Sequence, residues 1–558
     1  MLQTWLFQIA MFLFILTVIA IPLGEYMAKV FVGERTFLSP ILVPFENFLY
    51  KVFGVDIHVD MDWKTFTVSL LLFNLVGLIA LFLLQEAQGF LPLNPEKLKA
   101  VRWDTAINVA ISFVTNTDWQ PYKSETTMSY LTQMFGLGLQ NFLSAATGMA
   151  AAVALINAFI RKSTVGIGNF WVYLTRSLIY ILLPLAIAVA LVLVSQGCID
   201  NFHPYVHAQT LEGKEQIIAQ GPAASQIAIK HLGTSGGGFF TANSAHPYEN
   251  PTPFTDYLEL LSLLIIAAAF PFAFGALVNN RSQGWAIFAA MMFLFVMGLS
   301  FALWSELHGN PLLTKLGIHH GLNMEGKEER FGMLASVIFA SAGTATSTGA
   351  MNVSLGSLMP LTGLIAFFNM AIGGVIFGGV GCGFIGMLFY GMLAMFLIGL
   401  MIGRTPEIYG KKLEPYEMII TVVVLFLPCI VQLIFSAIAV TVLGNSSPRG
   451  LSEIIYTYAS SMSNNGSTLM VSESNTIFYN LTTGFVMLFG RFVTIVCALA
   501  IAGSVAQKKF NPPTARFPTA SPLFVFVLIS VVLVNGALTF FPVLVLGPIL
   551  EHLYIYST

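Results

Sequence analysis

Charged side chains are scarce in this sequence. Asp, Glu, Lys and Arg make up 9% of the 558 residues, whereas hydrophobic residues make up 56%. So little charge cannot cover a soluble protein of this length with polar groups. The net charge of −2 also argues against a nucleic-acid partner, because such partners require a basic surface. We therefore expect a lipid bilayer to surround most of this chain.

Motifs for redox chemistry and for nucleotide hydrolysis are lacking as well. The four cysteines are scattered without a CxxC pair, which favours small core residues over a metal or disulfide site. Neither a Walker A motif nor an Asp-Lys-Thr-Gly phosphorylation loop occurs. We expect no ATPase site and no organic cofactor in this chain, so ATP would act only through a partner. Residues 1–24 lack the features of a signal peptide, which predicts a retained first span.

What the sequence contains instead is a series of apolar runs of about 20 residues, long enough to cross a hydrocarbon layer ~30 Å thick. The run at 357–403 is too long for one straight crossing, and four glycines interrupt its centre. If this run is one broken span, the basic clusters at Arg161, Arg281, Arg404 and Lys508 all lie on the same side of the membrane. The positive-inside rule assigns that side to the cytoplasm.

This count predicts an all-α polytopic protein of the inner membrane, with ten spans and with both termini on the outer side of that membrane. The spans are expected near residues 4–24, 65–86, 139–160, 173–196, 256–278, 285–305, 357–403, 417–442, 478–505 and 522–548.

Four long segments on the outside share one pattern. Each has a half-apolar helical stretch of about 10 residues, too short to cross the bilayer, followed by small polar residues. The stretches and loops are 105–114 with Thr115, Asn116 and Thr117; 223–232 with Thr234, Ser235 and Gly236; 331–342 with Thr346, Ser347, Thr348 and Gly349; and 452–462 with Asn464, Asn465 and Gly466.

The order span, short helix, polar loop, span therefore occurs four times, which indicates a diverged internal repeat. The repeats are 65–162, 173–281, 285–412 (its second helix broken near 378–383) and 417–509, while 1–64 holds the first span and a cytoplasmic loop and 522–558 the last span.

Irregular backbone at membrane depth is tolerated only where it is buried in protein or lines an aqueous cavity. Four such loops meeting on one axis would turn their carbonyl oxygens toward a cation. Neutral oxygens suit a monovalent ion, because they replace its hydration shell without holding it too tightly. A Ca²⁺ or Mg²⁺ site would need carboxylates. Short helices aimed at the centre would add the partial negative charge of their C-terminal ends. Four unrelated turns are the alternative interpretation.

Around these loops the sequence resembles the KdpA family, the potassium-binding subunits of bacterial Kdp potassium-transporting ATPases. The matching strings are Ser112–Gln120, Gly233–Phe240 with His246–Pro251, Asn323–Gly332, Gly403–Glu407 with Gly410–Lys412, Asn464–Ser467, Gly490–Phe492 and Ala502–Ser504. They run along nearly the whole chain in order.

The resemblance implies four fused copies of the membrane–pore–membrane unit of potassium channels plus two extra spans. It also implies a K⁺ selectivity filter at Thr115–Thr117, Thr234–Gly236, Thr346–Gly349 and Asn464–Gly466. Gln120, Gly237, Gly238 and Ser467 are expected to support that filter. Potassium would pass sideways to a P-type ATPase subunit, KdpB, in a complex completed by KdpC and KdpF.

Several positions depart from the family pattern. Asp118 and Ser235 stand where Asn is common, and Thr348 stands where Cys or another small residue occurs. We expect these polar changes to alter ion affinity more than ion identity. Some relatives carry an acid at the position of Gly374, so another group would have to attract ions toward the exit in this chain.

A gate or exit region is expected around Gly378, Gly379, Gly381 and Gly383, with close helix packing as the alternative. Arg491 lies inside the ninth span, where an ionisable group is costly and therefore a functional candidate. We assign Arg491 and Arg404 to the same gate or exit region, although Arg404 is otherwise either a docking residue or an ordinary positive-inside residue.

Two other functions remain open. A stand-alone K⁺ channel or ion-coupled K⁺ symporter could share the four-repeat architecture. An amino-acid-type secondary transporter would instead show two inverted halves.

Overall fold

The computed structural model describes residues 2–317, 321–444, 449–469, 474–510 and 517–557, and this part of the chain is mostly helical. Ten helices in these ranges are long and apolar enough to cross a membrane. The predicted number of spans is therefore confirmed. The spanning helices are α1 (Leu2–Val32), α3 (Trp63–Ala87), α6 (Leu139–Ile160), α7 (Phe170–Arg176) with α8 (Leu183–Ser195), α10 (Pro253–Leu277), α11 (Arg281–Leu307), α15 (Cys382–Ile402), α16 (Pro415–Leu443), α18 (Ile477–Leu488) with α19 (Thr494–Gln507), and α20 (Pro522–Leu544).

Wider π-helical turns join or extend several of these spans. They are Thr132–Gly138 before α6, Ser177–Leu182 between α7 and α8, Phe489–Val493 between α18 and α19, and Val545–Ile549 between α20 and α21 (Leu550–Ser557). Such turns often occur at functional sites, and one of them carries Arg491.

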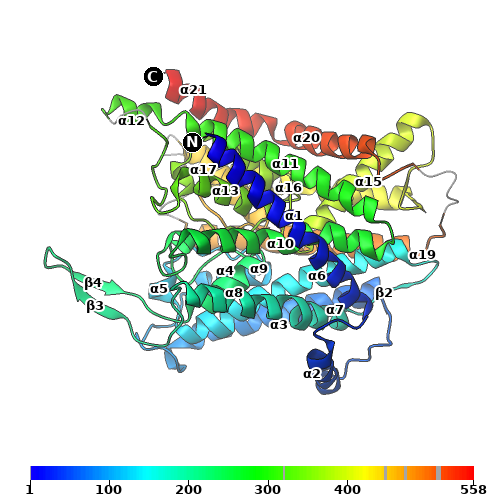
Figure 1. Cartoon of the computed structure of the whole chain (residues 1–558), viewed down its shortest axis with the longest axis horizontal. Helices are drawn as coiled ribbons and strands as arrows, with labels where there is room; N and C mark the ends of the chain where they lie inside the picture. Colours follow the sequence, from blue (N-terminus) through cyan, green and yellow to red (C-terminus); the bar gives the residue numbers. More distant parts are fainter. Residues whose placement is uncertain (1, 318–320, 445–448, 470–473, 511–516, 558) are drawn as a thin grey trace.

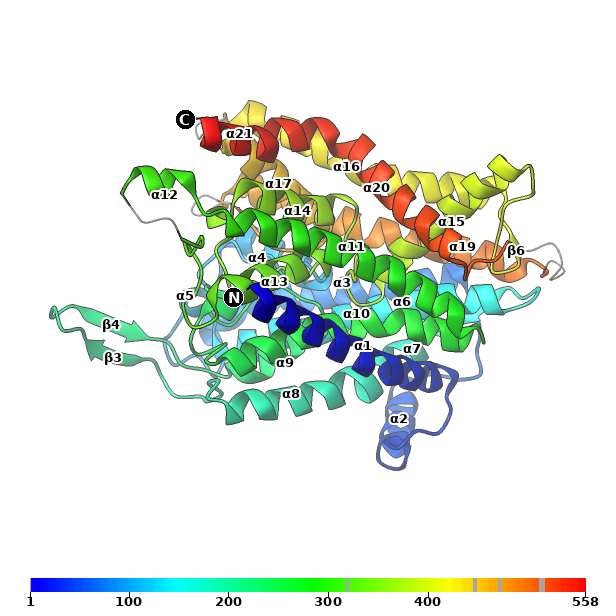
Figure 2. The ribbon, with the colours of Figure 1, turned by 45° about the horizontal axis from the view of Figure 1, so that its top comes forward.

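Strands are few and short. The described residues form three two-stranded antiparallel sheets. β1 (Met61–Asp62) pairs with β2 (Gly166–Gly168), β3 (Val206–Gln209) with β4 (Glu215–Ile218), and β5 (Glu407–Ile408) with β6 (Lys411–Lys412). The β3–β4 hairpin projects from one end of the helical body (Figures 1 and 2).

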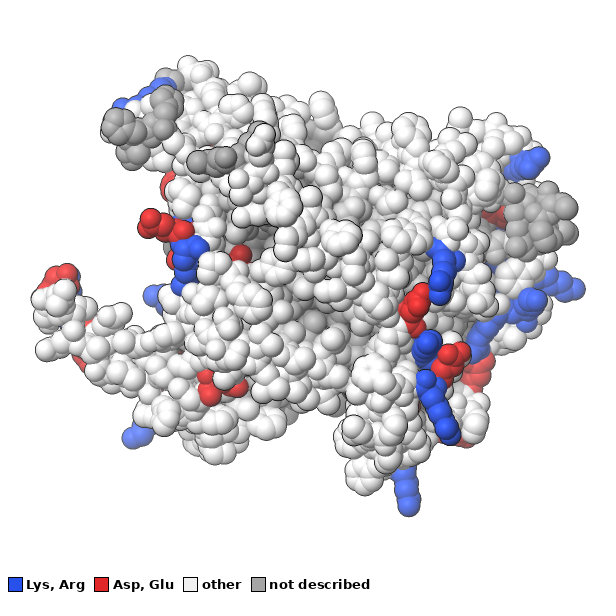
Figure 3. All heavy atoms as spheres, viewed as in Figure 1, with Lys and Arg blue, Asp and Glu red and all other residues white. Residues whose placement is uncertain are grey.

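The spanning helices lie side by side along the long axis of the molecule, and both chain ends lie at the same end of it (Figure 1). Charged side chains gather near the two ends, whereas the belt between them is white, and most of the Lys and Arg in this view lie at the end opposite the termini (Figure 3). An uncharged belt between two charged ends is the arrangement that a bilayer-spanning protein needs.

The seventh span is interrupted. α14 (Pro360–Ala371) enters the protein, irregular backbone follows, and α15 begins at Cys382. Within this break Gly373, Gly374 and Gly381 have positive φ values of 85°, 57° and 83°, a region that glycine adopts without steric cost. Irregular backbone at this depth lies inside the protein, where it avoids lipid.

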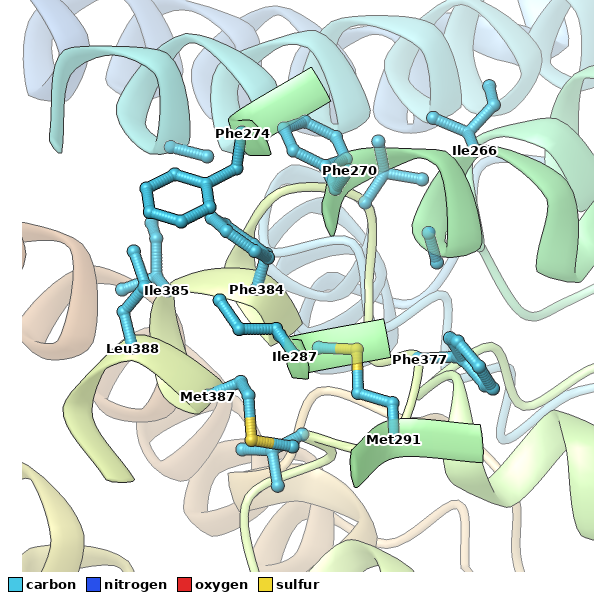
Figure 4. Packing of buried hydrophobic residues seen from close by; sticks show 14 of the residues in the cluster. Ile266, Phe270, Phe274, Ile287, Met291, Phe377, Phe384, Ile385, Met387 and Leu388 are labelled. Carbon is cyan, nitrogen blue, oxygen red and sulfur yellow. The ribbon is translucent and has the colours of Figure 1, made fainter. Parts of the chain in front are cut away.

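Aromatic side chains fix the interrupted segment against the core. Phe384, at the start of α15, packs on Phe270 and Phe274 of α10, with ring centroids 5.9 and 5.5 Å apart (Figure 4). Phe377, within the break, lies 5.7 Å from Phe288 and 6.1 Å from Phe295 of α11. Buried aromatic pairs of this kind stabilise a fixed geometry, so the break has a defined position in the fold.

Candidate ion-binding site

Four short helices stand between pairs of spans, at the positions that the hydropathy pattern predicts. They are α4 (Trp103–Val114), α9 (Ala223–Leu232), α13 (Gly332–Ala345) and α17 (Gly450–Met462). The residue after each helix donates its N–H to the carbonyl four positions earlier. These bonds are Thr115 to Ile111, Gly233 to Ile229, Thr346 to Ala342 and Ser463 to Ala459. Each helix therefore ends directly at the start of its polar loop.

The four loops then follow the same backbone course. The second residue of each loop has a positive φ between 48° and 60°. The third residue donates its N–H to the carbonyl five positions earlier, over 2.8 to 3.0 Å. The second residues are Asn116, Thr234, Ser347 and Asn464, and the third-residue bonds run from Thr117 to Ser112, Ser235 to Lys230, Thr348 to Gly343 and Asn465 to Ser460. Identical local geometry in four places is the structural form of the repeat.

The four loops meet around one point. A Cβ atom built on Gly236 would lie 2.6 Å from the carbonyl oxygen of Thr348, 3.1 Å from that of Thr117 and 3.2 Å from that of Asn465. These three oxygens belong to the third residues of the other three loops. Carbonyl groups from three loops therefore gather beside the glycine of the fourth loop, which is the kind of arrangement that replaces the hydration shell of an ion.

Hydrogen bonds between neighbouring loops hold this arrangement together. Asn116 Nδ2 donates to the Thr234 carbonyl at 2.9 Å. Asn464 Nδ2 donates to Thr117 Oγ1 at 3.0 Å, and Asn465 Nδ2 donates to the Gly343 carbonyl at 2.9 Å. All of these side chains are buried, so the amides have no competing water and the loops are fixed relative to one another.

The residues expected to support the loops lie against them. Gln120 Oε1 accepts from the Gly238 N–H at 3.0 Å, and Gln120 Nε2 donates to the Gly238 carbonyl at 3.3 Å. A Cβ on Gly237 would lie 3.1 Å from Gln120. In the fourth loop the Ser467 N–H donates to Asn465 Oδ1 at 3.1 Å, and the Ser467 hydroxyl lies 2.9 Å from the Tyr456 hydroxyl.

Comparison with known proteins agrees with this geometry. The model of the KdpA family, described as the potassium-transporting ATPase A subunit, matches residues 10–553. The chain belongs to the KdpA family. A curated relative from Rhizobium rhizogenes, named the potassium-transporting ATPase potassium-binding subunit, is 51% identical over 98% of each chain. One from Herpetosiphon aurantiacus with the same name is 49% identical over 99% of each chain.

A solved structure shares the fold at low sequence identity. The potassium transporter TrkH from Vibrio parahaemolyticus superimposes with a TM-score of 0.53 and 14% identity, covering 86% of this chain and 96% of TrkH. At this identity the likeness concerns the architecture alone. The KdpA fold is thus four span–short helix–loop–span units, with α1 and α20 as two further spans.

One feature of this KdpA-family chain was not foreseen from its sequence: a buried ion pair behind the second loop. Lys230, in the last turn of α9, lies 2.7 Å from Glu249, and both side chains are 0% exposed. Lys230 Nζ also donates to the Gly237 carbonyl at 3.1 Å and to Asn243 Oδ1 at 2.6 Å. The sequence does carry one indication of this pair. Lys230 lies in the half-apolar stretch 223–232, and a charged group in such a stretch must find a partner.

The string Asn323–Gly332 has a similar explanation. Lys327 lies 3.0 Å from Glu306 of α11, and Asn323 Nδ2 donates to the same carboxylate at 2.7 Å. Burial lowers the pKa of Lys327, while the Glu306 carboxylate partly offsets that shift. This ion pair fixes the segment that leads into α13.

A cavity lies beneath the loops. The second residues of three loops, Asn116, Ser347 and Asn464, line it together with the interrupted part of the seventh span and Gln432 of α16. Neither amide atom of Gln432 has a hydrogen-bond partner among the residues that the structure describes, although the side chain is 1% exposed. Polar side chains therefore line this cavity from the second residues of the loops to Gln432 of α16.

The expected gate residues divide into two groups. Gly379, Gly383 and Arg491 line the cavity, and Arg491 Nη2 donates to the Ser144 carbonyl at 2.9 Å. Gly378 touches Gly383, because a Cβ on Gly383 would clash with it.

Gly381 packs against Gly148 of α6. Arg404, by contrast, is exposed just beyond the far end of α15, a helix ~30 Å long at 1.5 Å per residue. The structure therefore does not bring Arg404 together with the others.

The chemistry of the site fits a monovalent cation. No cluster of three or more His, Cys, Asp or Glu side chains that could hold a metal ion occurs among the residues that the structure describes. Backbone carbonyls and neutral side-chain oxygens are the groups that the loops present, and these suit K⁺ better than a divalent ion.

Proposed function

We propose that this chain is the potassium-binding subunit of an ATP-driven K⁺ uptake complex in the bacterial inner membrane. The family match and the names of its curated relatives support this function. The chain belongs to a transporting ATPase without carrying a nucleotide motif of its own, so it serves as the ion-binding part of the complex. K⁺ is its cargo, and ATP acts through a partner.

The proposed filter consists of residues 115–117, 234–236, 346–349 and 464–466, supported by Gln120, Gly237, Gly238 and Ser467. The observation that carries the assignment is the position of Gly236, which has the carbonyl oxygens of Thr117, Thr348 and Asn465 from the other three loops around it. The C-terminal ends of the four pore helices add partial negative charge toward the same place. Each contributes to a cation site without a full charge.

We further propose that the basic end of the molecule faces the cytoplasm. Lys411 Nζ donates to the carbonyls of Val505 at 3.0 Å and Lys508 at 2.7 Å, and also to that of Arg161. The basic clusters of three repeats thus lie next to one another, as the positive-inside rule requires. In this orientation both termini and the filter mouth face outward. We propose the four repeats at residues 65–162, 173–281, 285–412 and 417–509.

The ion then leaves the filter through the cavity beneath it. The interrupted backbone around residues 378–383 borders this cavity. Arg491 adds a positive charge to the cavity wall, which disfavours the passage of a cation along that side. The partners proposed from the family resemblance are the ATPase subunit KdpB, to which the ion passes, together with KdpC and KdpF. A stand-alone channel of the same architecture is the competing function.

Uptake of radioactive rubidium by vesicles that contain the assembled complex tests this proposal. We expect uptake that requires ATP and is blocked by competing K⁺. Uptake by this chain alone, at the same rate with and without ATP, would contradict the proposal and favour the channel. A matched preparation with Gly236→Asp should show no selective uptake under either condition.

A further inference from the structure

The short hairpin β5–β6 lies at the end of the molecule opposite the two chain ends (Figure 2). The two residues of its turn, Tyr409 and Gly410, have φ values of 51° and 81°, as a two-residue hairpin turn requires. Glycine adopts this region freely, whereas a positive φ is unusual for a bulky aromatic residue. The contacts of the Tyr409 side chain must therefore compensate for an unfavourable backbone conformation.

This hairpin turns back along the helix that precedes it. A Cβ on Gly399 would lie 3.0 Å from the Cα atom of Pro406, and one on Gly391 would lie 3.8 Å from the Ile408 side chain. Gly391 is separated from Ile402, the last residue of α15, by roughly 16 Å of helix at 1.5 Å per residue. Ile408 is 0% exposed. The hairpin is therefore packed into the helical body beside α15.

The Tyr409 ring lies against helices of the first two repeats. Its centroid is 5.4 Å from that of Phe159, in the last turn of α6, and 4.9 Å from that of Phe274, in the last turn of α10. Both pairs have the edge-to-face geometry that aromatic rings prefer. The turn of the hairpin thus places one aromatic side chain against the ends of two spans, each of which follows a filter loop.

The Lys411 ammonium group contacts the ends of α6 and α19. Nζ donates to the carbonyl of Arg161, which follows α6, and to the carbonyls of Val505 and Lys508 at the end of α19, over 2.5 to 3.0 Å. These three acceptors use all three N–H groups of an ammonium, and helix dipoles favour a cation at this place. Burial and the charge of Lys508 lower the pKa of Lys411 to about 8, so Lys411 keeps its proton at neutral pH.

The hairpin contacts the span after each of the four filter loops: α15 through Ile408, α6 and α10 through Tyr409, and the ends of α6 and α19 through Lys411. We propose that this hairpin seals the pore at its cytoplasmic end, with Tyr409 and Lys411 as the residues that hold it in place. This inference rests on the proposed function. Because the four spans are joined below the filter, an ion finds no straight route to the cytoplasm and leaves through the cavity beneath the loops.

A seal and a merely structural contact have different consequences for ion flow. When a seal is loosened, Rb⁺ moves down its gradient without ATP, and it still passes the filter first. The filter carbonyls distinguish ions by size and by the number of ligands, so this flow should remain selective for Rb⁺ over Na⁺. A structural contact that is lost without opening a route should instead lower the melting temperature and leave the membrane closed to both ions.

The test measures rubidium flux without ATP into vesicles that contain the assembled complex. Tyr409→Ala removes the ring, and Lys411→Met removes the three hydrogen bonds. We expect each variant to raise this flux by about tenfold or more over wild type. Two matched controls should stay as tight as wild type. Tyr409→Phe keeps the ring and its packing, and Lys412→Met removes a charge at an exposed position of the same strand.

Vesicles that stay tight with both Tyr409→Ala and Lys411→Met would overturn the inference. A raised flux that is equal for Rb⁺ and Na⁺ would also overturn it, because such a flux does not pass the filter. A wild-type complex without ATP-dependent uptake would instead contradict the proposed function. Thermal melting of each complex before the assay shows whether a variant has lost its fold, and the other variant then decides the test.

Discussion

Lys230 Nζ lies 2.7 Å from Glu249 Oε2, and neither side chain has any exposed surface. This pair ties the last turn of α9 to the segment that follows the second filter loop. Its ammonium group also holds the Gly237 carbonyl.

Lys230→Met should destabilise the protein strongly. The substitution leaves the Glu249 carboxylate buried without a counter-ion, which typically costs about 3–5 kcal/mol. Thermal melting of the purified complex measures the effect. Adding Glu249→Gln to the same chain removes the orphaned charge and should restore part of the melting temperature. A single Lys230→Met variant that melts like wild type would show that the pair contributes little.

Gly236→Ala should abolish high-affinity K⁺ uptake. The new Cβ would lie 2.6 Å from the Thr348 carbonyl oxygen and 3.1 and 3.2 Å from the carbonyl oxygens of Thr117 and Asn465, so it would occupy the ion path. Gly363→Ala is the matched control, because Gly363 lies in α14 with nothing within 4 Å of a Cβ. Rubidium uptake at micromolar concentrations separates the two, and normal uptake by the Gly236 variant would refute the filter assignment.

Gln120→Arg should weaken the apparent K⁺ affinity. Gln120 exchanges two hydrogen bonds with the Gly238 backbone behind the second loop. An arginine at this position removes the acceptor of the Gly238 N–H and adds a positive charge. Gln196→Arg supplies the same charge at an exposed position after α8, where water and salt screen it. We expect a half-maximal K⁺ concentration raised at least several-fold in the first variant only. Equal values in both would place Gln120 outside the influence of the filter.

Gln432→Leu should slow transport without weakening K⁺ binding. Both amide atoms of Gln432 lack hydrogen-bond partners in the described part of the chain. Replacing them with apolar atoms therefore removes a desolvation cost and should keep or raise the melting temperature. The same change removes a polar group from the cavity below the filter. The measurement pairs melting temperature with the maximal rate and half-maximal concentration of K⁺-stimulated hydrolysis. A wild-type maximal rate would remove Gln432 from the ion route.

Much of the architecture could be predicted from the sequence because bilayer length and charge asymmetry leave few alternatives. The ten spans follow from hydropathy, and the stretch 223–232 coincides with α9. Helix starts were less predictable. The third span was expected from 139, but its helical segment begins at Thr132 in a π-helical turn, since polar residues such as Gln133 are buried there rather than exposed.

The contacts behind the filter could not be predicted in the same way. Lys230 and Glu249 are 19 residues apart, and no periodic pattern links a pore helix with the irregular segment that follows it. The cavity role of Gln432 depends on α16 lying beside the interrupted seventh span. The expected gate region groups Arg404 with the glycine-rich break, whereas α15 separates the two along the chain.

The four filter loops belong to a single polypeptide, and this has an evolutionary consequence. In a pore assembled from four identical subunits, every mutation appears at four corners at once, and one added charge becomes four. Here a codon change alters one corner and leaves three as they were. Asp118 beside the first loop and the buried Lys230 beside the second can therefore change independently. Natural selection can thus alter ion binding in small steps without changing all four loops.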